Sequence, residues 1–174
     1  SVGISKAKSE DQLRDAIALA RQYDYKIIVE RAILGMELEC AVLGNRENAE
    51  ASIPCEILPS REFYDYEDKY LLNQSGVNLP APLNEEQTAE LRRLAVAGFH
   101  SLLCEGMSRV DFLLEKATGN LYLNEVNTIP GFTSISMYPK MWEYSGIPYP
   151  ALLDRLIELA MARHERKRSL RFTR

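Results

Sequence analysis

Long apolar runs are missing from this sequence. No run approaches the roughly 18 residues that a membrane-spanning helix requires, and residues 1–6 lack the apolar stretch of a secretory signal peptide. Both observations disfavour a transmembrane or an exported protein. We expect a cytoplasmic protein that does not associate with membranes.

Cysteine is scarce and odd in number. Cys40, Cys55 and Cys104 are widely separated and lie among apolar neighbours. Such a scattered set does not form a disulfide framework, and free cysteine side chains are usually buried. We expect three buried free thiols in a reducing compartment.

Neither sign of charge dominates, since the net charge of the 174 residues is only −4. With 46% hydrophobic residues the chain can bury a core, and its length limits it to one or two small lobes.

The one charged cluster, residues 163–168, is basic. It fits either an arm for nucleic acid or a helix carboxyl end, where basic residues meet the helix dipole favourably. Since the rest of the chain is acidic, we favour a frayed helix end and expect no nucleic-acid partner.

Spacing of apolar and capping residues predicts alternating helices and strands. Ser9 and Asn84 are each followed three residues later by glutamine, which is typical of a helix start. Helices are expected at residues 9–23, from 84 to about 105, at 138–145 and from 150 through 160. Strands are expected at 26–30, 36–43, 109–114 and 121–126, and a long loop, of a length that usually has a function, at 60–82.

The last two predicted strands form a hairpin around a polar turn at residues 116–120. If the middle residue of that turn is its centre, Asp111 lies opposite Glu125 and Arg109 lies opposite Asn127. All four positions share one parity along the strands. Their side chains should therefore leave the same face of the sheet.

Two carboxylates that face each other across a sheet need something positive between them. Arg109 alone could supply it, which would make the hairpin an ion-paired strand surface. The amide of Asn127 favours another interpretation, because two acids and a neutral oxygen form an incomplete oxygen shell typical of Mg²⁺. That ion takes its remaining ligands from water and substrate phosphates. A nucleotide is thus implied, although the sequence has no phosphate-binding loop of the G-x-x-x-x-G-K type.

Four segments carry a family resemblance. Residues 109–112 (RVDF) and 124–134 (NEVNTIPGFTS) closely resemble the metal-binding stretch of D-alanine–D-alanine ligases, which are ATP-grasp enzymes. Residues 1–3 resemble the end of that family's serine-rich phosphate loop. Residues 63–70 (FYDYEDKY) resemble its mobile loop over the active site.

The resemblance implies an α+β fold of the ATP-grasp type. Residues 1–31 would end the central subdomain, and residues 32–174 would form the carboxy-terminal subdomain, an antiparallel sheet flanked by helices. The family has further parts ahead of the matched segment, and we expect ligation to require them. The resemblance also implies that the complete enzyme is a homodimer.

The implied activity joins two D-alanines into D-alanyl-D-alanine for peptidoglycan synthesis, using ATP and an acylphosphate intermediate. Asp111, Glu125 and Asn127 would hold Mg²⁺ or Mn²⁺, with Glu125 bridging a pair of ions. Such metals suit phosphoryl transfer, which depends mostly on positioning and charge neutralisation. Arg109 and the backbone N–H of Gly131 would meet the negative charge that develops on the carbonyl oxygen.

Nucleotide contacts are carried over in the same way. Glu30 and Glu37 would bind the adenine amino group and the ribose hydroxyls, with apolar contacts from Ile33, Phe63 and Leu113. Either glutamate could instead be a solvated acid at a strand end, because exposed glutamate is common.

The loop at residues 63–70 would close over the substrates. Lys69 would reach the ATP phosphates, and Tyr70 would hydrogen-bond with Ser1 and Glu37, so that water is kept from the acylphosphate. The loop could also be an ordinary amphipathic segment. The related depsipeptide ligases have phenylalanine or a histidine-bearing loop here, so Tyr70 favours a dipeptide product.

Ser136 and Met137 lie where the family binds the carboxylate of the second D-alanine. Ser136 could equally be the N-cap of the helix that follows it. Two other functions stay open: a D-alanine–D-serine or D-alanine–D-lactate ligase, and a non-catalytic nucleotide-binding fragment of the same fold.

Overall fold

The computed structural model describes residues 2–58, 76–133 and 135–171. These residues divide into two units, and each is described by itself. The first is residues 2–32, and the second comprises residues 33–58 with 76–133 and 135–171.

The first unit contains one helix, α1 (Glu10–Ala20). As predicted, the hydroxyl of Ser9 caps its start by accepting a hydrogen bond of 3.3 Å from the backbone N–H of Gln12. The predicted strand at residues 26–30 is wrong, because that segment has no regular secondary structure. A β-branched run becomes a strand only where a neighbour accepts its backbone hydrogen bonds, and no strand of the described residues pairs with it.

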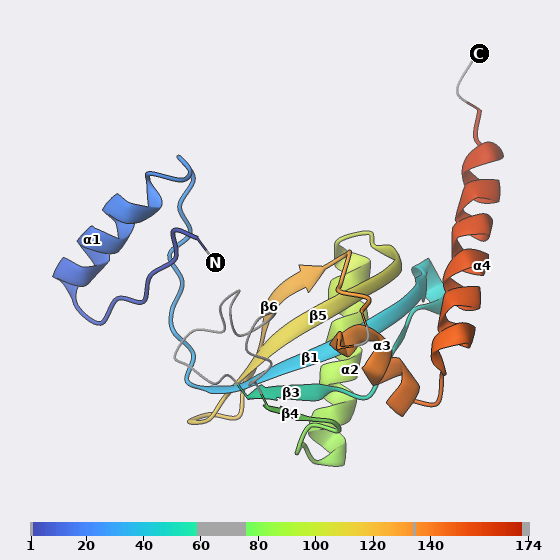
Figure 1. Cartoon of the computed structure of the whole chain (residues 1–174), viewed down its shortest axis with the longest axis horizontal. Helices are drawn as coiled ribbons and strands as arrows, with labels where there is room; N and C mark the ends of the chain where they lie inside the picture. Colours follow the sequence, from blue (N-terminus) through green and yellow to red (C-terminus); the bar gives the residue numbers. More distant parts are fainter. Residues whose placement is uncertain (1, 59–75, 134, 172–174) are drawn as a thin grey trace. The chain divides into compact units, whose positions relative to one another are not determined.

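The second unit is built on a six-stranded antiparallel sheet (Figure 1). Its order is β4-β3-β1-β5-β6, with β2 paired to β1 beside that path. The strands are β1 (Gly35–Asn45), β2 (Glu50–Ala51), β3 (Cys55–Leu58), β4 (Gly76–Asn78), β5 (Glu105–Glu115) and β6 (Leu121–Asn127).

Three predicted strands are confirmed as β1, β5 and β6, each longer than expected. β1 pairs with β5 along its whole length, from Gly35 opposite Glu115 to Asn45 opposite Glu105. β4 lies within the segment predicted to be a loop at residues 60–82. That short edge strand is exposed at all its positions, so its sequence has no apolar alternation to reveal it. The remainder of the predicted loop, up to residue 75, lies outside the described residues.

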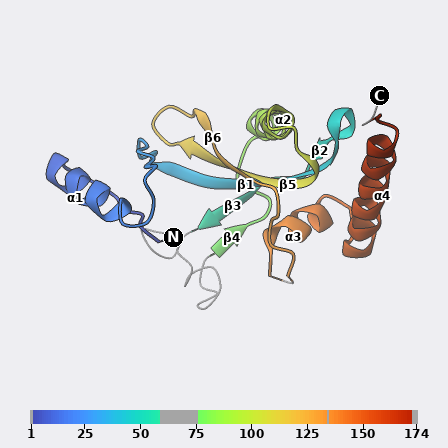
Figure 2. The ribbon, with the colours of Figure 1, turned by 90° about the horizontal axis from the view of Figure 1, so that it is seen from above.

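One face of the sheet is covered by α2 (Glu85–Ser101), which Figure 2 shows along that face with α3 on the other. The predicted cap is confirmed as a reciprocal capping box between Asn84 and Gln87. Even-numbered residues of β1 and β5 pack against α2 in the main core, as strand alternation requires. This core includes Leu38, Cys40, Val42, Val110, Phe112, Leu91, Ala95 and Phe99.

The other face is partly covered by α3 (Met137–Tyr144), and α4 (Tyr149–Arg168) contacts β1 and β5. Tyr138 of α3 is buried and its hydroxyl donates a hydrogen bond of 3.0 Å to the backbone oxygen of Val42. No helix in the described ranges combines the length and apolar character needed to cross a membrane.

α4 runs further than predicted because its basic end is held on the sheet. Nε of Arg163 lies 2.7 Å from Oε2 of Glu105, and Arg166 bonds to the other oxygen. Nε of Arg46 lies 3.3 Å from that second oxygen. The basic cluster thus sits at a helix carboxyl end, as favoured from the sequence, but the helix continues through it to Arg168.

Two of the three cysteines match the expectation of buried free thiols. Cys40 and Cys55 are fully buried, whereas Cys104 is partly exposed. Cys104 immediately precedes β5, in the short connection from α2, and this position leaves it less covered than a strand residue on the core face.

We expect Glu105→Gln to lower the free energy of unfolding by about 1–3 kcal/mol, because a largely buried carboxylate that serves three guanidinium groups is lost. Urea-induced unfolding measures the change. Glu50→Gln is the matched control, since it removes the more exposed pair that Glu50 forms with Arg155 of the same helix, at 2.6 Å. That control should cost less than about 1 kcal/mol. Equal losses in the two variants would contradict the anchoring role of Glu105.

Burial raises the pKa of Cys40 to about 12, and it raises the pKa of Cys55 further. Folding therefore favours the neutral thiols, and their stabilising contribution is lost as the pH rises from about 9 through these raised values. We expect the free energy of unfolding to fall over this range, and to fall less in Cys40→Ala.

In thiol labelling of the folded protein at pH 8, Cys104 should react first. Equal labelling rates for Cys40 and Cys104 would overturn this expectation.

Candidate functional site

The two residue pairs predicted for the hairpin of β5 and β6 are present. Asp111 lies opposite Glu125, and Arg109 lies opposite Asn127. This prediction is confirmed, and the four side chains leave the same face of the sheet. On the other side of β5, Glu39 of β1 lies opposite Asp111. Carboxyl groups from three neighbouring strands therefore stand in one row.

A β-bulge in β6 makes this row possible. The register shifts by one residue between Asp111 and Phe112, so Phe112 pairs with Leu123, and Asn124 is the extra residue. Leu123 consequently shares the α2 face with Phe112. Glu125, beyond the bulge, shares the opposite face with Asp111.

Arg109 ties the row together. Its Nε and Nη2 donate hydrogen bonds of 2.8 and 2.7 Å to the two oxygens of Asp111. Its Nε lies 3.3 Å from Oε1 of Glu39, and Nη2 lies 3.8 Å from Oε1 of Glu125. The side chains of Arg109, Glu39 and Asp111 are no more than 15% exposed, whereas that of Glu125 is 58% exposed. Glu125 is thus the outermost acid of the row.

The charges of this row favour a cation. Burial disfavours the charged form of Arg109, but the hydrogen bond to Asp111 and the charges of Glu39, Asp111 and Glu125 outweigh it and raise the pKa of Arg109. The guanidinium is therefore permanently charged. Three carboxylates surround this one cation, so the row has an excess of negative charge.

The donors of this face fit a divalent ion in kind. Asp111, Glu125 and Asn127 present the carboxylate and amide oxygens that Mg²⁺ prefers. Oδ1 of Asn127 accepts a hydrogen bond of 3.1 Å from the backbone N–H of Ile129, which orients the amide. Within the residues that the structure describes, no three His, Cys, Asp or Glu side chains converge on a metal position. A bound ion would therefore need the amide oxygen and ligands from water or substrate as well.

The predicted nucleotide contacts fall in both units. Glu37 lies on β1 opposite Leu113 of β5, two residues before Glu39 and on the same face. Ile33 precedes β1 and is half-buried. The structure thus brings Glu37 and Leu113 side by side. Glu30 is an exposed residue of the first unit.

The loop after β6 brings Gly131 and Ser136 together. Ser136 occupies the N-cap position of α3, but its hydroxyl makes no capping bond. It accepts a hydrogen bond of 3.0 Å from the backbone N–H of Thr133 instead. A Cβ atom on Gly131 would lie only 2.7 Å from Oγ of Ser136, so a larger residue here would displace that hydroxyl. Met137, the first residue of α3, is half-buried.

Four predicted site residues lie outside the described part of the chain. They are Ser1, Phe63, Lys69 and Tyr70. Their roles remain predictions from the sequence.

Glu39 is the member of the row that sequence reasoning missed. It alternates with Glu37 along β1, and this signal places both acids on one face. The pairing of β1 with β5, which the sequence does not reveal, is what brings Glu39 to Arg109.

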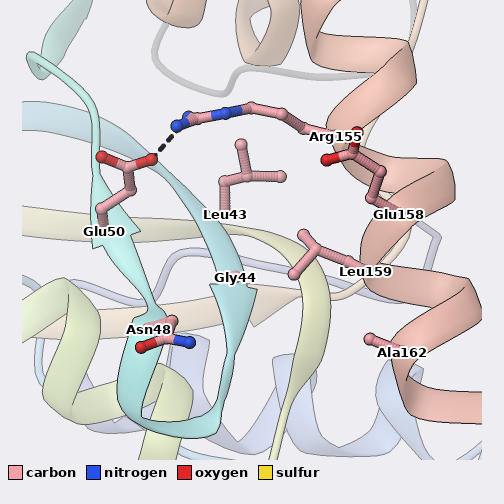
Figure 3. Close-up of a pocket in the computed structure, with 8 residues that line it drawn as sticks. All are labelled: Leu43, Gly44, Asn48, Glu50, Arg155, Glu158, Leu159 and Ala162. Atoms are coloured by element: carbon pink, nitrogen blue, oxygen red, sulfur yellow. Dashed lines mark hydrogen bonds and ion pairs between the residues drawn. The ribbon is translucent and has the colours of Figure 1, made fainter. Parts of the chain in front are cut away.

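A separate cavity of about 280 Å³ lies between the β1–β2 hairpin and α4 (Figure 3). The ion pair between Arg155 and Glu50 spans it, and Leu43 and Leu159 form apolar walls. None of the predicted site residues lines it. The row around Arg109 is therefore the stronger candidate for chemistry.

Comparison with known proteins identifies the family. The family model described as "D-ala D-ala ligase C-terminus" matches residues 1–158. The D-alanine–D-alanine ligase of Solibacter usitatus is 65% identical over 174 residues, which cover 100% of this chain and 53% of that protein. The ligase of the same name from Thermoanaerobacter sp. is 55% identical over 168 residues, covering 96% and 46%. The chain spans about half the length of these relatives.

Solved structures give the same result. The D-alanine–D-alanine ligase of Coxiella burnetii matches with a TM-score of 0.82 and 41% identity, over 94% of this chain and 42% of that one. The VanG D-Ala:D-Ser ligase of Enterococcus faecalis matches with a TM-score of 0.79 and 41% identity, over 90% and 45%. These matches confirm the expected α+β fold of the ATP-grasp type. The chain therefore belongs to the family of D-alanine–D-alanine ligase carboxy-terminal domains.

Proposed function

We propose that the protein containing this chain joins two D-alanines into D-alanyl-D-alanine at the expense of ATP, for cell-wall precursors. The observation that carries this proposal is the row of acids around Arg109, on a chain of the ligase family. The acids supply negative charge for a metal–nucleotide complex, and the arginine supplies a fixed cation for an anionic transition state.

Asp111, Glu125 and Asn127 would hold Mg²⁺ or Mn²⁺ on this face. When bound, the metal neutralises the phosphate oxygens of ATP and orients the γ-phosphoryl group. Glu125 is the most exposed acid of the row and would meet the incoming ion first. Asn127 is already oriented by its bond from Ile129.

Arg109 would stabilise the negative charge on the carbonyl oxygen when the amine of the second D-alanine attacks the acylphosphate. Its guanidinium is fixed by hydrogen bonds before any substrate arrives, and such preorganisation makes a donor effective. The backbone N–H of Gly131 would be the second donor. Ser136 and the backbone of Met137 would receive the substrate carboxylate. The hydroxyl of Ser136 does not cap α3, and it would exchange its contact with the Thr133 hydroxyl, at 2.9 Å, for the substrate.

The nucleotide would lie against Glu37 and Leu113, which are paired on this face. Ile33, Phe63 and Glu30 would complete its contacts. The closing loop would contribute Lys69 to the phosphates and Tyr70, with Ser1, to the cover over the substrates.

Residues 1–31 and 32–174 would form the end of a central ATP-grasp subdomain and the carboxy-terminal subdomain. The full-length enzyme would be cytoplasmic, because its ATP and its product belong to cytoplasmic biosynthesis. The resemblance to the ligase family suggests that it is a homodimer.

One neighbour supports a second candidate, the joining of D-alanine to D-serine. The matched VanG structure bears the name D-Ala:D-Ser ligase, and its identity to this chain equals that of the Coxiella burnetii ligase. Similarity to solved structures therefore does not separate the two products. Tyr70 favours a dipeptide over a D-lactate ester.

In the full-length enzyme, we expect Arg109→Ala to reduce D-alanine-dependent release of phosphate from ATP by on the order of 10² to 10³, as the loss of a preorganised donor does. Arg155→Ala is the control, because Arg155 pairs with Glu50 beside the separate cavity. It should leave turnover within about twofold. Unchanged turnover in Arg109→Ala would remove the proposed role.

With D-alanine, D-serine and D-lactate present together, mass spectrometry should detect D-alanyl-D-alanine as the main product. A main product that contains serine would transfer the proposal to the second candidate. If no product forms in the presence of ATP, the remaining hypothesis is a non-catalytic nucleotide-binding fragment of the same fold.

A further inference from the structure

Glu39 is the most enclosed acid of the row around Arg109. Its side chain is 9% exposed, and Oε1 lies 3.3 Å from Nε of Arg109. The residue directly opposite Arg109 on β1 is Ala41, which has no polar side-chain atom. On the β1 side, the carboxylate of Glu39 is therefore the acceptor within reach of the guanidinium.

Asp111 would have two partners in the proposed site, the guanidinium of Arg109 and the cation. Both of its oxygens accept hydrogen bonds from Arg109, at 2.8 and 2.7 Å. A divalent cation on Asp111 would share at least one of these oxygens with Arg109 and draw its negative charge away from the guanidinium. The two-pronged contact would then weaken while the side chain of Arg109 remains only 15% exposed. A buried guanidinium without a carboxylate partner is strongly disfavoured.

Glu125 is poorly suited to replace that partner. It is 3.8 Å from Nη2 of Arg109, lies on the outer side of the row and is itself a proposed ligand of the cation. Glu39 lies across β5 from Glu125, since both acids are paired with Asp111 from opposite sides. It can therefore accept the guanidinium without competing for the ion.

We propose that Glu39 is a positioning residue that takes over the guanidinium of Arg109 when a divalent cation binds Asp111. This inference rests on the proposed function of the row. Glu39 would keep Arg109 charged, paired and directed at the substrate, and it would lower the cost of releasing Asp111 to the metal. Groups that orient a metal ligand typically change metal affinity by about 10 to 100-fold when they are replaced.

The test is direct Mn²⁺ binding, measured by electron paramagnetic resonance on the full-length enzyme with a non-hydrolysable ATP analogue. We expect Glu39→Gln to raise the Mn²⁺ dissociation constant about tenfold, because the guanidinium then stays on Asp111. In an Arg109→Ala background the same substitution should change the constant by less than about twofold, since no guanidinium remains to be held. Glu39→Asp, which keeps the charge, should give an intermediate value.

Glu115→Gln is the matched control for charge. Glu115 lies on β5 with the same strand parity as Asp111 but four residues further along, so its substitution removes one negative charge without touching Arg109. Its Mn²⁺ dissociation constant should stay within about twofold of the unsubstituted enzyme. Circular dichroism of each variant confirms that it folds, and Glu39→Asp provides the comparison if Glu39→Gln does not.

Two results would overturn the inference. One is Mn²⁺ binding in Glu39→Gln that equals that of the unsubstituted enzyme. The other is an equal weakening with and without Arg109, which would show that Glu39 acts through its charge alone. An unsubstituted enzyme that neither binds Mn²⁺ with the analogue nor releases phosphate with D-alanine would instead contradict the proposed function.

Discussion

The two-pronged bond from Arg109 to Asp111 is the interaction on which the candidate site depends. It lets carboxylates from β1, β5 and β6 stand next to one another on one sheet face, where like charges would otherwise destabilise the pairing. It also fixes a cation in a partly buried place before any substrate is present. The guanidinium of Arg109 therefore has two effects. It stabilises the pairing of three acid-bearing strands, and it is the group proposed to act on the substrate.

The rest of the second unit supports this row. α2 packs on the opposite face through Leu91, Ala95 and Phe99, so the strands that carry the site rest on the buried core. α3 and α4 contact β1 on or beside the site-bearing face, and Glu105 ties the end of α4 back to the sheet. The part of that face that includes Glu37, Glu39 and Glu125 presents acids. The sheet thus has an apolar face that packs against α2 and a face that carries charged side chains.

Strand parity made the hairpin row predictable. The assumed turn centre at residue 118 gave the correct pairing of Asp111 with Glu125, but nearer the turn the register is shifted by one residue, and the bulge that restores it was not visible in the sequence. A capping box located the start of α2. The failures concern pairing between distant segments. Residues 26–30 have the composition of a strand but find no partner among the described residues, and β4 has no alternation because it is exposed throughout. Glu39 was visible as part of an alternating run, but only the pairing of β1 with β5 shows that it meets Arg109.

The bulge at Asn124 divides β6 into two segments that differ by one residue in their register with β5. The half next to the turn contributes Leu123 to the packing against α2, and the half beyond the bulge contributes Glu125 and Asn127 to the opposite face. The extra residue changes the alternation of side chains, so that residues on either side of it can each take the face that they need. Substitutions near the tip of the hairpin can thus alter the packing against α2 while Glu125 and Asn127 keep their orientation on the opposite face.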